Sequence, residues 1–241
     1  MIPVKTKLIP LSTVHATENG RKIFIRKGII IRPTSLTIHS TANLKSNALN
    51  ERNWLVNENN KSGASWNICV DEKEAVIAIP LNEKSNHAGS NEGNMTSIGL
   101  EICESGNREK TLINAIEVSA WILKTFGLTS KNLKQHHDWN GKNCPRILRD
   151  TNEWKWFVKS VKLRMEADKM LENLIDEYGY DVVEKALKNL IEAEKNKDVI
   201  PEWAKSEYDE AVKIGITDGT EPQMYATRCE AAIMIKRANE K

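Results

Sequence analysis

Long apolar runs are absent from this chain of 241 residues. No stretch approaches the ~18 consecutive apolar residues that a membrane-spanning helix needs, which excludes a helical membrane protein. Residues 1–7 lack the apolar core of a secretory signal, so we expect the chain to be made in a cytoplasm. Low-complexity tracts are also absent, and a hydrophobic content of 40% predicts a folded protein.

Cysteine is scarce, and the net charge is only +2. The four cysteines are too widely spaced for a small disulfide scaffold, which leaves buried thiols or metal ligands: Cys69, Cys103, Cys144 and Cys229. The charge is unevenly distributed, because residues 161–241 hold 13 Lys and Arg against 18 Asp and Glu, whereas residues 1–160 hold 22 against 15. This asymmetry predicts two domains, with the first suited to an anionic partner. No basic helix or aromatic stripe favours nucleic acid.

The first domain, residues 1–160, alternates strand and helix patterns. Short β-branched or alternating runs predict strands over residues 22–25, 28–31, 35–40, 66–71, 75–80 and 97–103. Helical spacing predicts one helix over 47–59, anchored by Leu49, Trp54 and Leu55, and another over 111–126. We therefore expect an α/β domain. Beyond residue 160 the apolar stripes are helical throughout, including 171–178 and 181–191, which predicts a small all-helical domain over 161–241.

The loop from His136 to Pro145 carries the clearest chemical signal. A histidine and a cysteine eight residues apart, in a loop that contains Gly141, can converge on one metal ion. His39, near the end of a predicted strand, can supply a third ligand, and imidazole and thiolate ligands favour zinc over magnesium or calcium. The spacing alone leaves open a solvated loop histidine and an inert buried cysteine.

Glu101 is an acidic residue in a strand that otherwise has the pattern of an interior strand. Alternation places Ile98, Leu100 and Ile102 on one face and Glu101 on the other. A carboxylate near a metal centre can act as a general base toward water and then pass the proton to a leaving amine. The alternative is a salt bridge at a sheet edge.

Residues 20–160 resemble the zinc-dependent N-acetylmuramoyl-L-alanine amidases of the amidase-2 type. This group includes phage endolysins and bacterial autolysins and shares its fold with the peptidoglycan recognition proteins. The matching segments are residues 37–43, 65–68, 79–83, 87–89, 98–102 and 136–145. The resemblance implies a mixed β-sheet flanked by helices, a bound Zn²⁺ and peptidoglycan as the substrate.

The resemblance also implies roles for individual residues. His39, His136 and Cys144 correspond to the zinc ligands, Glu101 to the catalytic acid that activates water, and Lys142 to a lysine that stabilises the oxyanion. The family register favours His136 over the neighbouring His137 as the ligand.

Three further residues are expected at the substrate. His87 matches a histidine that lines the substrate groove. Trp66 stands where many relatives have tyrosine, and Asn67 replaces a frequent histidine, which removes a partner for a metal ligand. His15 matches no segment, so we expect it at the surface.

The second part of the chain is similar to a single S-layer-homology-like repeat, over residues 202–230. Such repeats bind secondary polymers of Gram-positive cell walls. Residues 164–198 suit either a spacer or a dimerisation hairpin, which leaves a homodimer open.

The function implied is hydrolysis of the amide bond between the lactyl group of N-acetylmuramic acid and L-alanine in bacterial peptidoglycan. The enzyme is then expected to act on the wall of a Gram-positive host after release from the cytoplasm. Two alternatives remain: a peptidoglycan-binding module without activity, against which Cys144 and Glu101 argue, and a zinc peptidase acting on wall peptides.

Overall fold

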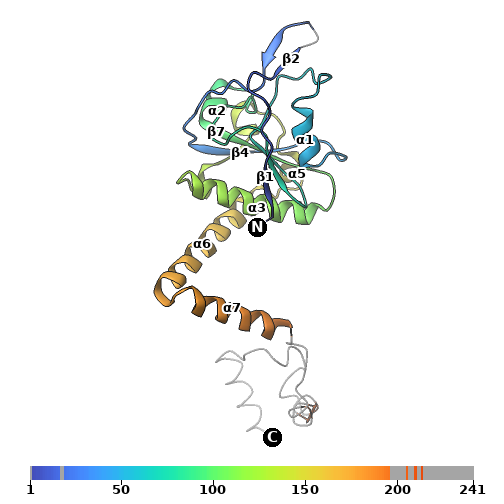
Figure 1. Ribbon diagram of the computed structural model, residues 1–241. Coiled ribbons are helices and arrows are strands. Elements are labelled where there is room, and N and C mark those ends of the chain that lie inside the picture. The colour runs from blue at the N-terminus through green and yellow to red at the C-terminus, as the bar shows by residue number, and fades with distance from the viewer. Residues whose placement is uncertain (1, 17–18, 196–204, 206–208, 211–212, 214–241) are drawn as a thin grey trace. The chain divides into compact units, whose positions relative to one another are not determined.

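A computed structural model describes residues 2–16, 19–195, 205, 209–210 and 213 (Figure 1). The chain divides into two compact units, Met1–Lys169 and Met170–Lys241. None of the helices in the described ranges combines the length and the apolar character that crossing a bilayer requires.

The first unit is built around a six-stranded mixed sheet with the strand order β1-β6-β5-β7-β4-β8. The strands β5, β7, β4 and β8 run parallel to one another, β6 is antiparallel to β5, and β1 is parallel to β6. A separate antiparallel hairpin pairs β2 with β3. The strand bounds are β1 (Val4–Thr6), β2 (Val14–Ala16), β3 (Lys22–Phe24), β4 (Ser35–Ser40), β5 (Ile68–Val70), β6 (Ala75–Ile77), β7 (Ser97–Ile102) and β8 (Leu133–Gln135). The predicted α/β class with a mixed sheet is confirmed.

The longest helix of the first unit, α3, begins after Asn107, whose side chain accepts a hydrogen bond from the Lys110 N–H. It ends before Gly127, which has a φ of 65°. The helix bounds are α1 (Ala48–Trp54), α2 (Asn91–Thr96), α3 (Arg108–Thr125), the 3₁₀ helix η1 (Ser130–Asn132), α4 (His137–Asn140), α5 (Arg146–Arg149), α6 (Trp154–Tyr178) and α7 (Tyr180–Lys195).

The alternation of β4 and β7 gives the sheet two different faces. On one face the apolar side chains pack against α3, and Phe157 and Val161 of α6 join the same core: Leu36, Ile38, Ile98, Leu100 and Ile102. The residues between them point to the opposite face, where Cys69 and Cys103 pack with Leu55 at the end of α1. The α3 face is therefore structural, and the polar residues of both strands gather on the α1 face.

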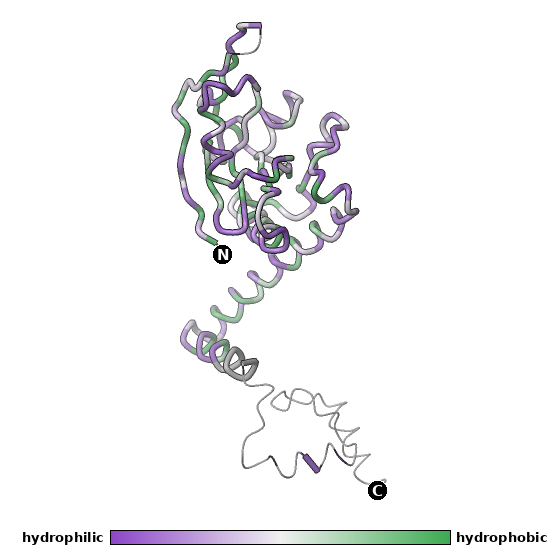
Figure 2. The backbone as a smooth tube through the Cα atoms, turned by 90° about the vertical axis from the view of Figure 1, so that its right-hand side faces the viewer, coloured by the Kyte–Doolittle hydropathy of each residue, from purple (hydrophilic) through white to green (hydrophobic). Residues whose placement is uncertain are grey.

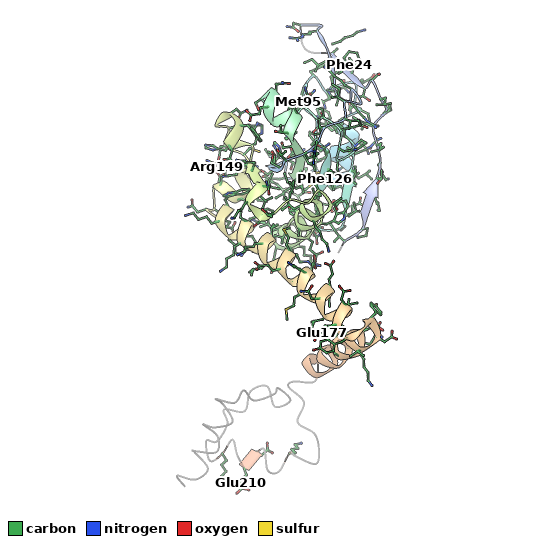
Figure 3. The ribbon with its side chains drawn as sticks, turned by 90° about the vertical axis from the view of Figure 1, so that its left-hand side faces the viewer. Phe24, Met95, Phe126, Arg149, Glu177 and Glu210 are labelled. Carbon is green, nitrogen blue, oxygen red and sulfur yellow. The ribbon has the colours of Figure 1, made fainter. Side chains whose placement is uncertain are left out.

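Two expectations about the first unit are wrong in detail. Residues 28–31 form no strand, only a single bridge between Ile30 and Glu83, because Pro33 has no N–H with which to continue a ladder. The helix predicted over 47–59 is shorter, and Trp54 is 43% exposed rather than an apolar anchor. Phe24 and Met95, labelled in Figure 3, are also exposed.

The helix α6 runs through residue 160, where we expected a domain boundary. Apolar and polar residues alternate along it in Figure 2. The helices expected over 171–178 and 181–191 lie within α6 and α7. The S-layer-homology-like repeat over 202–230 and Cys229 fall almost entirely outside the described residues, so a separate helical domain that binds wall polymer or forms a dimer stays a prediction.

Candidate metal centre and active-site pocket

His39 reaches the α1 face of the sheet because of its position in β4. Leu36 and Ile38 are buried against α3, so the alternating residues Thr37 and His39 point the other way. The parallel register of β4 and β7 places His39 directly opposite Glu101. His39 Nδ1 lies 4.0 Å from Glu101 Oε1.

The loop that follows β8 returns to the same place. His136 precedes the short helix α4, and Gly141, in the left-handed region with a φ of 78°, ends that helix and reverses the chain. The His137 N–H then donates to the Cys144 carbonyl over 3.1 Å, which ties the two ends of the loop together. His136 and Cys144 are therefore held side by side.

The structure brings together the three predicted metal ligands. The ligand atoms of His39, His136 and Cys144 lie within 4.8 Å of one another, and His39 Nδ1 is 3.7 Å from Cys144 Sγ. All three side chains are buried. The neighbouring His137 is 41% exposed and lies beside Asp138, outside this cluster. The geometry thus agrees with the preference for His136.

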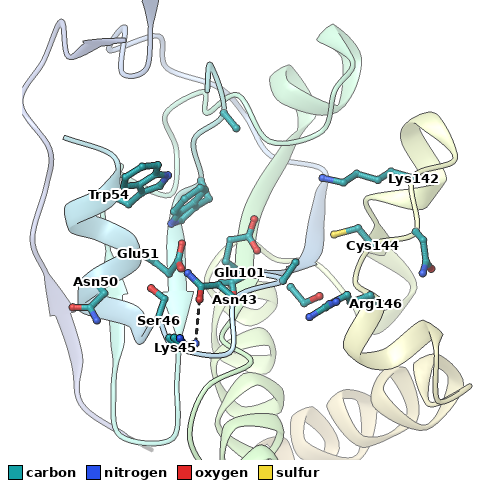
Figure 4. Close-up of a pocket in the computed structure, with 16 residues that line it drawn as sticks. Asn43, Lys45, Ser46, Asn50, Glu51, Trp54, Glu101, Lys142, Cys144 and Arg146 are labelled. Atoms are coloured by element: carbon teal, nitrogen blue, oxygen red, sulfur yellow. Dashed lines mark hydrogen bonds between the residues drawn. The ribbon is translucent and has the colours of Figure 1, made fainter. Parts of the chain in front are cut away.

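A pocket of about 610 Å³ opens beside the cluster. Figure 4 shows Glu101 between two walls, with Glu51 and Trp54 of α1 on one side and Lys142 and Cys144 on the other. The remaining lining residues come from the end of β4 and the segment that joins it to α1, from α1 itself, from the segment before β5, from the loop after α4 and from the start of α5: Ser40, Thr41, Ala42, Asn43, Lys45, Ser46, Asn50, Ala64, Trp66, Asn143 and Arg146. The two predicted catalytic residues therefore share one pocket.

Burial keeps the imidazoles of the site neutral. The pKa of His39 falls well below its ordinary value because of burial, with further lowering by His87, His136 and Lys142. Burial, followed by the nearby Lys142 charge, lowers the pKa of His136 to about 4. A neutral imidazole keeps a lone pair available for a metal ion.

The pKa values of the carboxyl and thiol groups of the site shift upward instead. Burial, followed by the nearby charge of Glu51, raises the pKa of Glu101 to about 8, although Lys142 opposes the shift. Burial and then the Glu101 charge raise the pKa of the Cys144 thiol to about 12. Both groups are thus protonated at neutral pH until a cation compensates their negative charge.

The residues present fit a metal ion of the zinc type. His136 Nδ1 and Glu101 Oε2 are buried and have no hydrogen-bond partner among the described residues. Two imidazoles and one thiol form a three-ligand set typical of catalytic zinc, which leaves a coordination position free.

Comparison with known proteins assigns the family. Residues 31–147 match the family model described as N-acetylmuramoyl-L-alanine amidase. The solved structure of the catalytic domain of XlyA is 31% identical, with a TM-score of 0.57, over 66% of this chain and 99% of that domain. The chain belongs to the N-acetylmuramoyl-L-alanine amidase family.

Other proteins of this family are similar to the chain over the same part of its length. A mutant endolysin from Bacillus subtilis is 31% identical, with a TM-score of 0.58, over 67% of this chain and 99% of that structure. The amidase CwlA of a Bacillus species is 38% identical over 146 residues, which are 58% of this chain and 57% of CwlA. The chain spans about half the length of the curated relatives it matches.

Of the three residues expected at the substrate, only Trp66 lines the pocket. Asn67 is fully buried, and its amide is fully engaged, since it donates to the carbonyls of Pro80 and Glu83 and accepts from Ser85 Oγ and the Gly99 N–H. The structure therefore corrects the prediction for Asn67, which joins β5 to its neighbours instead.

The prediction for His87 is corrected in the same way. His87 is 5% exposed and does not line the pocket. Its ring lies behind His39, with His87 Nδ1 2.9 Å from His39 Nε2. The ring therefore contacts a proposed metal ligand and lies outside the lining of this pocket.

Sequence reasoning missed three features of the pocket. Glu51 is a buried carboxyl group on α1, and Trp54 beside it is partly exposed. Arg146 forms an ion pair with Glu104, which holds α5 against the end of β7. The acidic residue within an apolar helix pattern was a signal for Glu51, whereas the Arg146 pair joins segments 42 residues apart and left no local signal.

Proposed function

We propose that the chain is a zinc-dependent N-acetylmuramoyl-L-alanine amidase. It hydrolyses the amide bond between the lactyl group of N-acetylmuramic acid and the L-alanine of the stem peptide in bacterial peptidoglycan, and so acts on the cell wall. The observation that carries this proposal is the convergence of His39, His136 and Cys144 beside Glu101 in one pocket. The family supports the choice of bond.

His39, His136 and Cys144 would hold the ion. Bound Zn²⁺ supplies a Lewis acid that polarises the scissile carbonyl and favours ionisation of water. Glu101 accepts a proton from the attacking water and delivers it to the amine that leaves on the L-alanine side. The raised pKa of Glu101, about 8, suits a group that must take up and release a proton near neutral pH.

Two further residues of the pocket contribute to this reaction. Lys142 extends from the loop toward Glu101 in Figure 4, and its ammonium offsets the negative charge that develops on the carbonyl oxygen. Trp66 lines the pocket wall, and its indole ring offers an apolar surface to the substrate.

The test is digestion of purified Gram-positive walls with the full chain, followed by analysis of new amino termini. New L-alanine termini that vanish with a chelator and return with Zn²⁺ are the expected result. Binding to walls without new termini would support a recognition module instead. Release of single amino acids would support a peptidase.

A further inference from the structure

His87 lies in a buried position that connects a proposed metal ligand to the interior of the sheet. Its Nδ1 is 2.9 Å from His39 Nε2, and its Nε2 is 3.2 Å from both the carbonyl oxygen and Oγ of Ser97. His39, His87 and Ser97 are all at least 95% buried. The His87 ring thus bridges β4 and the start of β7 on the α1 face of the sheet.

The hydrogen-bonding groups of Ser97 determine which atoms donate in the series of hydrogen bonds from Ser97 through His87 to His39. Its carbonyl oxygen can only accept. Its hydroxyl donates to the Gly93 carbonyl over 2.7 Å and accepts from Thr37 Oγ1 over 2.8 Å, so it has no proton left for His87. The hydrogen that joins His87 to Ser97 must therefore belong to His87 Nε2.

The proton on His87 Nε2 determines the tautomer of His39. A neutral His87 with its proton on Nε2 presents a lone pair at Nδ1, which accepts from the Nε2–H of His39. His39 then keeps its own lone pair at Nδ1, the nitrogen that faces Cys144 Sγ at 3.7 Å. The hydrogen bonds from His39 to His87 and from His87 to Ser97 thus leave Nδ1 of His39 available to bind a metal ion.

The same serine connects to the loop that carries the other two ligands. Trp139, on α4 between His136 and Cys144, donates its Nε1–H to Thr37 Oγ1 over 2.9 Å. Thr37 in turn donates to Ser97. The position of α4 is therefore coupled through two successive hydrogen bonds to Ser97, which orients His87.

Contacts on both sides fix the position of the His87 ring. A Cβ on Gly99 would lie 2.7 Å from His87 Cγ, so the ring rests directly on the backbone of β7, where only glycine gives it room. The backbone N–H groups of His87 and Ala88 both donate to Asn94 Oδ1, which holds the segment from the other side. Its position is fixed before any ligand binds.

We propose that His87 is a positioning residue that fixes the tautomer and orientation of His39, so that Nδ1 is presented to the metal. This inference rests on the proposed function for the metal itself. Protein groups that orient a ligating histidine typically raise metal affinity about 10- to 100-fold.

The test compares the wild-type chain of 241 residues with His87→Leu and His87→Asn by titration of Zn²⁺ alone against a competing chelator. His87→Leu removes the acceptor and is expected to weaken Zn²⁺ binding about 10- to 100-fold. His87→Asn keeps an oxygen acceptor close to the position of Nδ1 and should recover a large part of the loss. His15→Leu is the matched control, because it removes another buried imidazole, one outside the site, and should bind Zn²⁺ like the wild type.

A second readout uses the metal-free chain and so does not depend on zinc. Nitrogen-15 NMR of the wild type is expected to show His39 protonated at Nε2, with loss of this slowly exchanging proton in His87→Leu. Equal Zn²⁺ affinity in the wild type and His87→Leu, or a wild-type His39 protonated at Nδ1, would overturn the inference and leave the amidase proposal intact. A wild type that binds no Zn²⁺ would overturn the proposed function, and the NMR result would still decide the role of His87.

Discussion

His39 and Glu101 are direct neighbours across two parallel strands, with His39 Nδ1 4.0 Å from Glu101 Oε1. This pair defines the site, because it places a proposed metal ligand and a proposed proton carrier on the same face of the sheet. A shift of one residue in the register of β4 and β7 would turn one of them toward α3. The apolar residues of both strands, buried on the α3 face, prevent that shift.

Glu101→Gln should retain the fold and the metal and lose most of the turnover. The amide cannot accept the proton of the attacking water, and loss of a general acid–base residue costs about 10²- to 10⁴-fold in rate. The measurement is kcat on wall fragments, with zinc content and circular dichroism recorded in parallel. Near-normal turnover would remove Glu101 from its proposed role.

The same substitution should stabilise the metal-free chain at alkaline pH. The folded-state pKa of Glu101, about 8, lies above the unfolded value, so the folded state holds an extra proton between about pH 4.5 and pH 8. Wild-type stability therefore falls as the pH rises through this window, and Glu101→Gln avoids that loss. Melting in a chelator at about pH 5 and about pH 8.5 should show the variant gaining on the wild type at the higher pH.

Glu104→Gln is a control for which the expected change in stability has the opposite sign. Burial raises the pKa of Glu104, but hydrogen bonds from Arg146 and others outweigh burial, so its folded-state pKa is lowered. Its charge therefore stabilises the fold above the unfolded pKa, and the variant should lose stability at neutral and alkaline pH. A Glu101→Gln difference that is equal at both pH values would contradict the assignment.

Cys144→Ser should weaken metal binding. The serine hydroxyl does not ionise to a ligand as the thiol does, so one of three ligands is lost. Cys69→Ala is the matched control, since Cys69 is also a free buried cysteine but packs with Cys103 in the core below α1. The measurement is the zinc content of the purified chains, and unchanged zinc in Cys144→Ser would refute this ligand set.

The sequence allowed prediction of which residues converge at the site, but not of how deeply the residues around them are buried. His39, Glu101 and the loop ending at Cys144 were accessible because alternation identifies the face of a strand, and a loop with Gly141 can reverse the chain. The depth of His87 and Asn67 depends on contacts with Ser97 and Gly99, which no local pattern records. The sequence therefore predicts both residues at the substrate, whereas the structure buries them outside the lining of the pocket.

His15 illustrates the same limit outside the site. We expected it at the surface, yet it is 3% exposed, and its ring nitrogens lie 2.5 Å and 2.8 Å from the carbonyl oxygens of Ser62 and Leu55. These partners are 47 and 40 residues away in sequence. Tertiary contacts of this range decide burial, and they are invisible to periodicity.

Trp66→Phe should weaken substrate binding with little change in kcat. The phenyl ring is smaller than the indole ring that lines the pocket, so apolar contact with the substrate is lost. A loss equivalent to one or two buried CH₂ groups, about 0.8 kcal/mol each, corresponds to an increase in KM of roughly 4- to 15-fold. Steady-state kinetics on a soluble muropeptide gives both constants, and an unchanged KM would show that the Trp66 ring does not contact the substrate.

Lys142→Met should lower kcat more than it raises KM. The ammonium is proposed to act on charge that appears during the reaction, so its loss affects the transition state more than the bound substrate. Because Lys142 is solvent-exposed, water screens part of the effect, and a decrease of about 10- to 100-fold in kcat is expected. Lys45→Met removes another lysine of the same pocket and should leave kcat nearly unchanged. Equal losses of kcat in the two variants would point to a general effect of positive charge on an anionic wall, whereas a loss confined to Lys142→Met requires a charge placed near the reacting carbonyl.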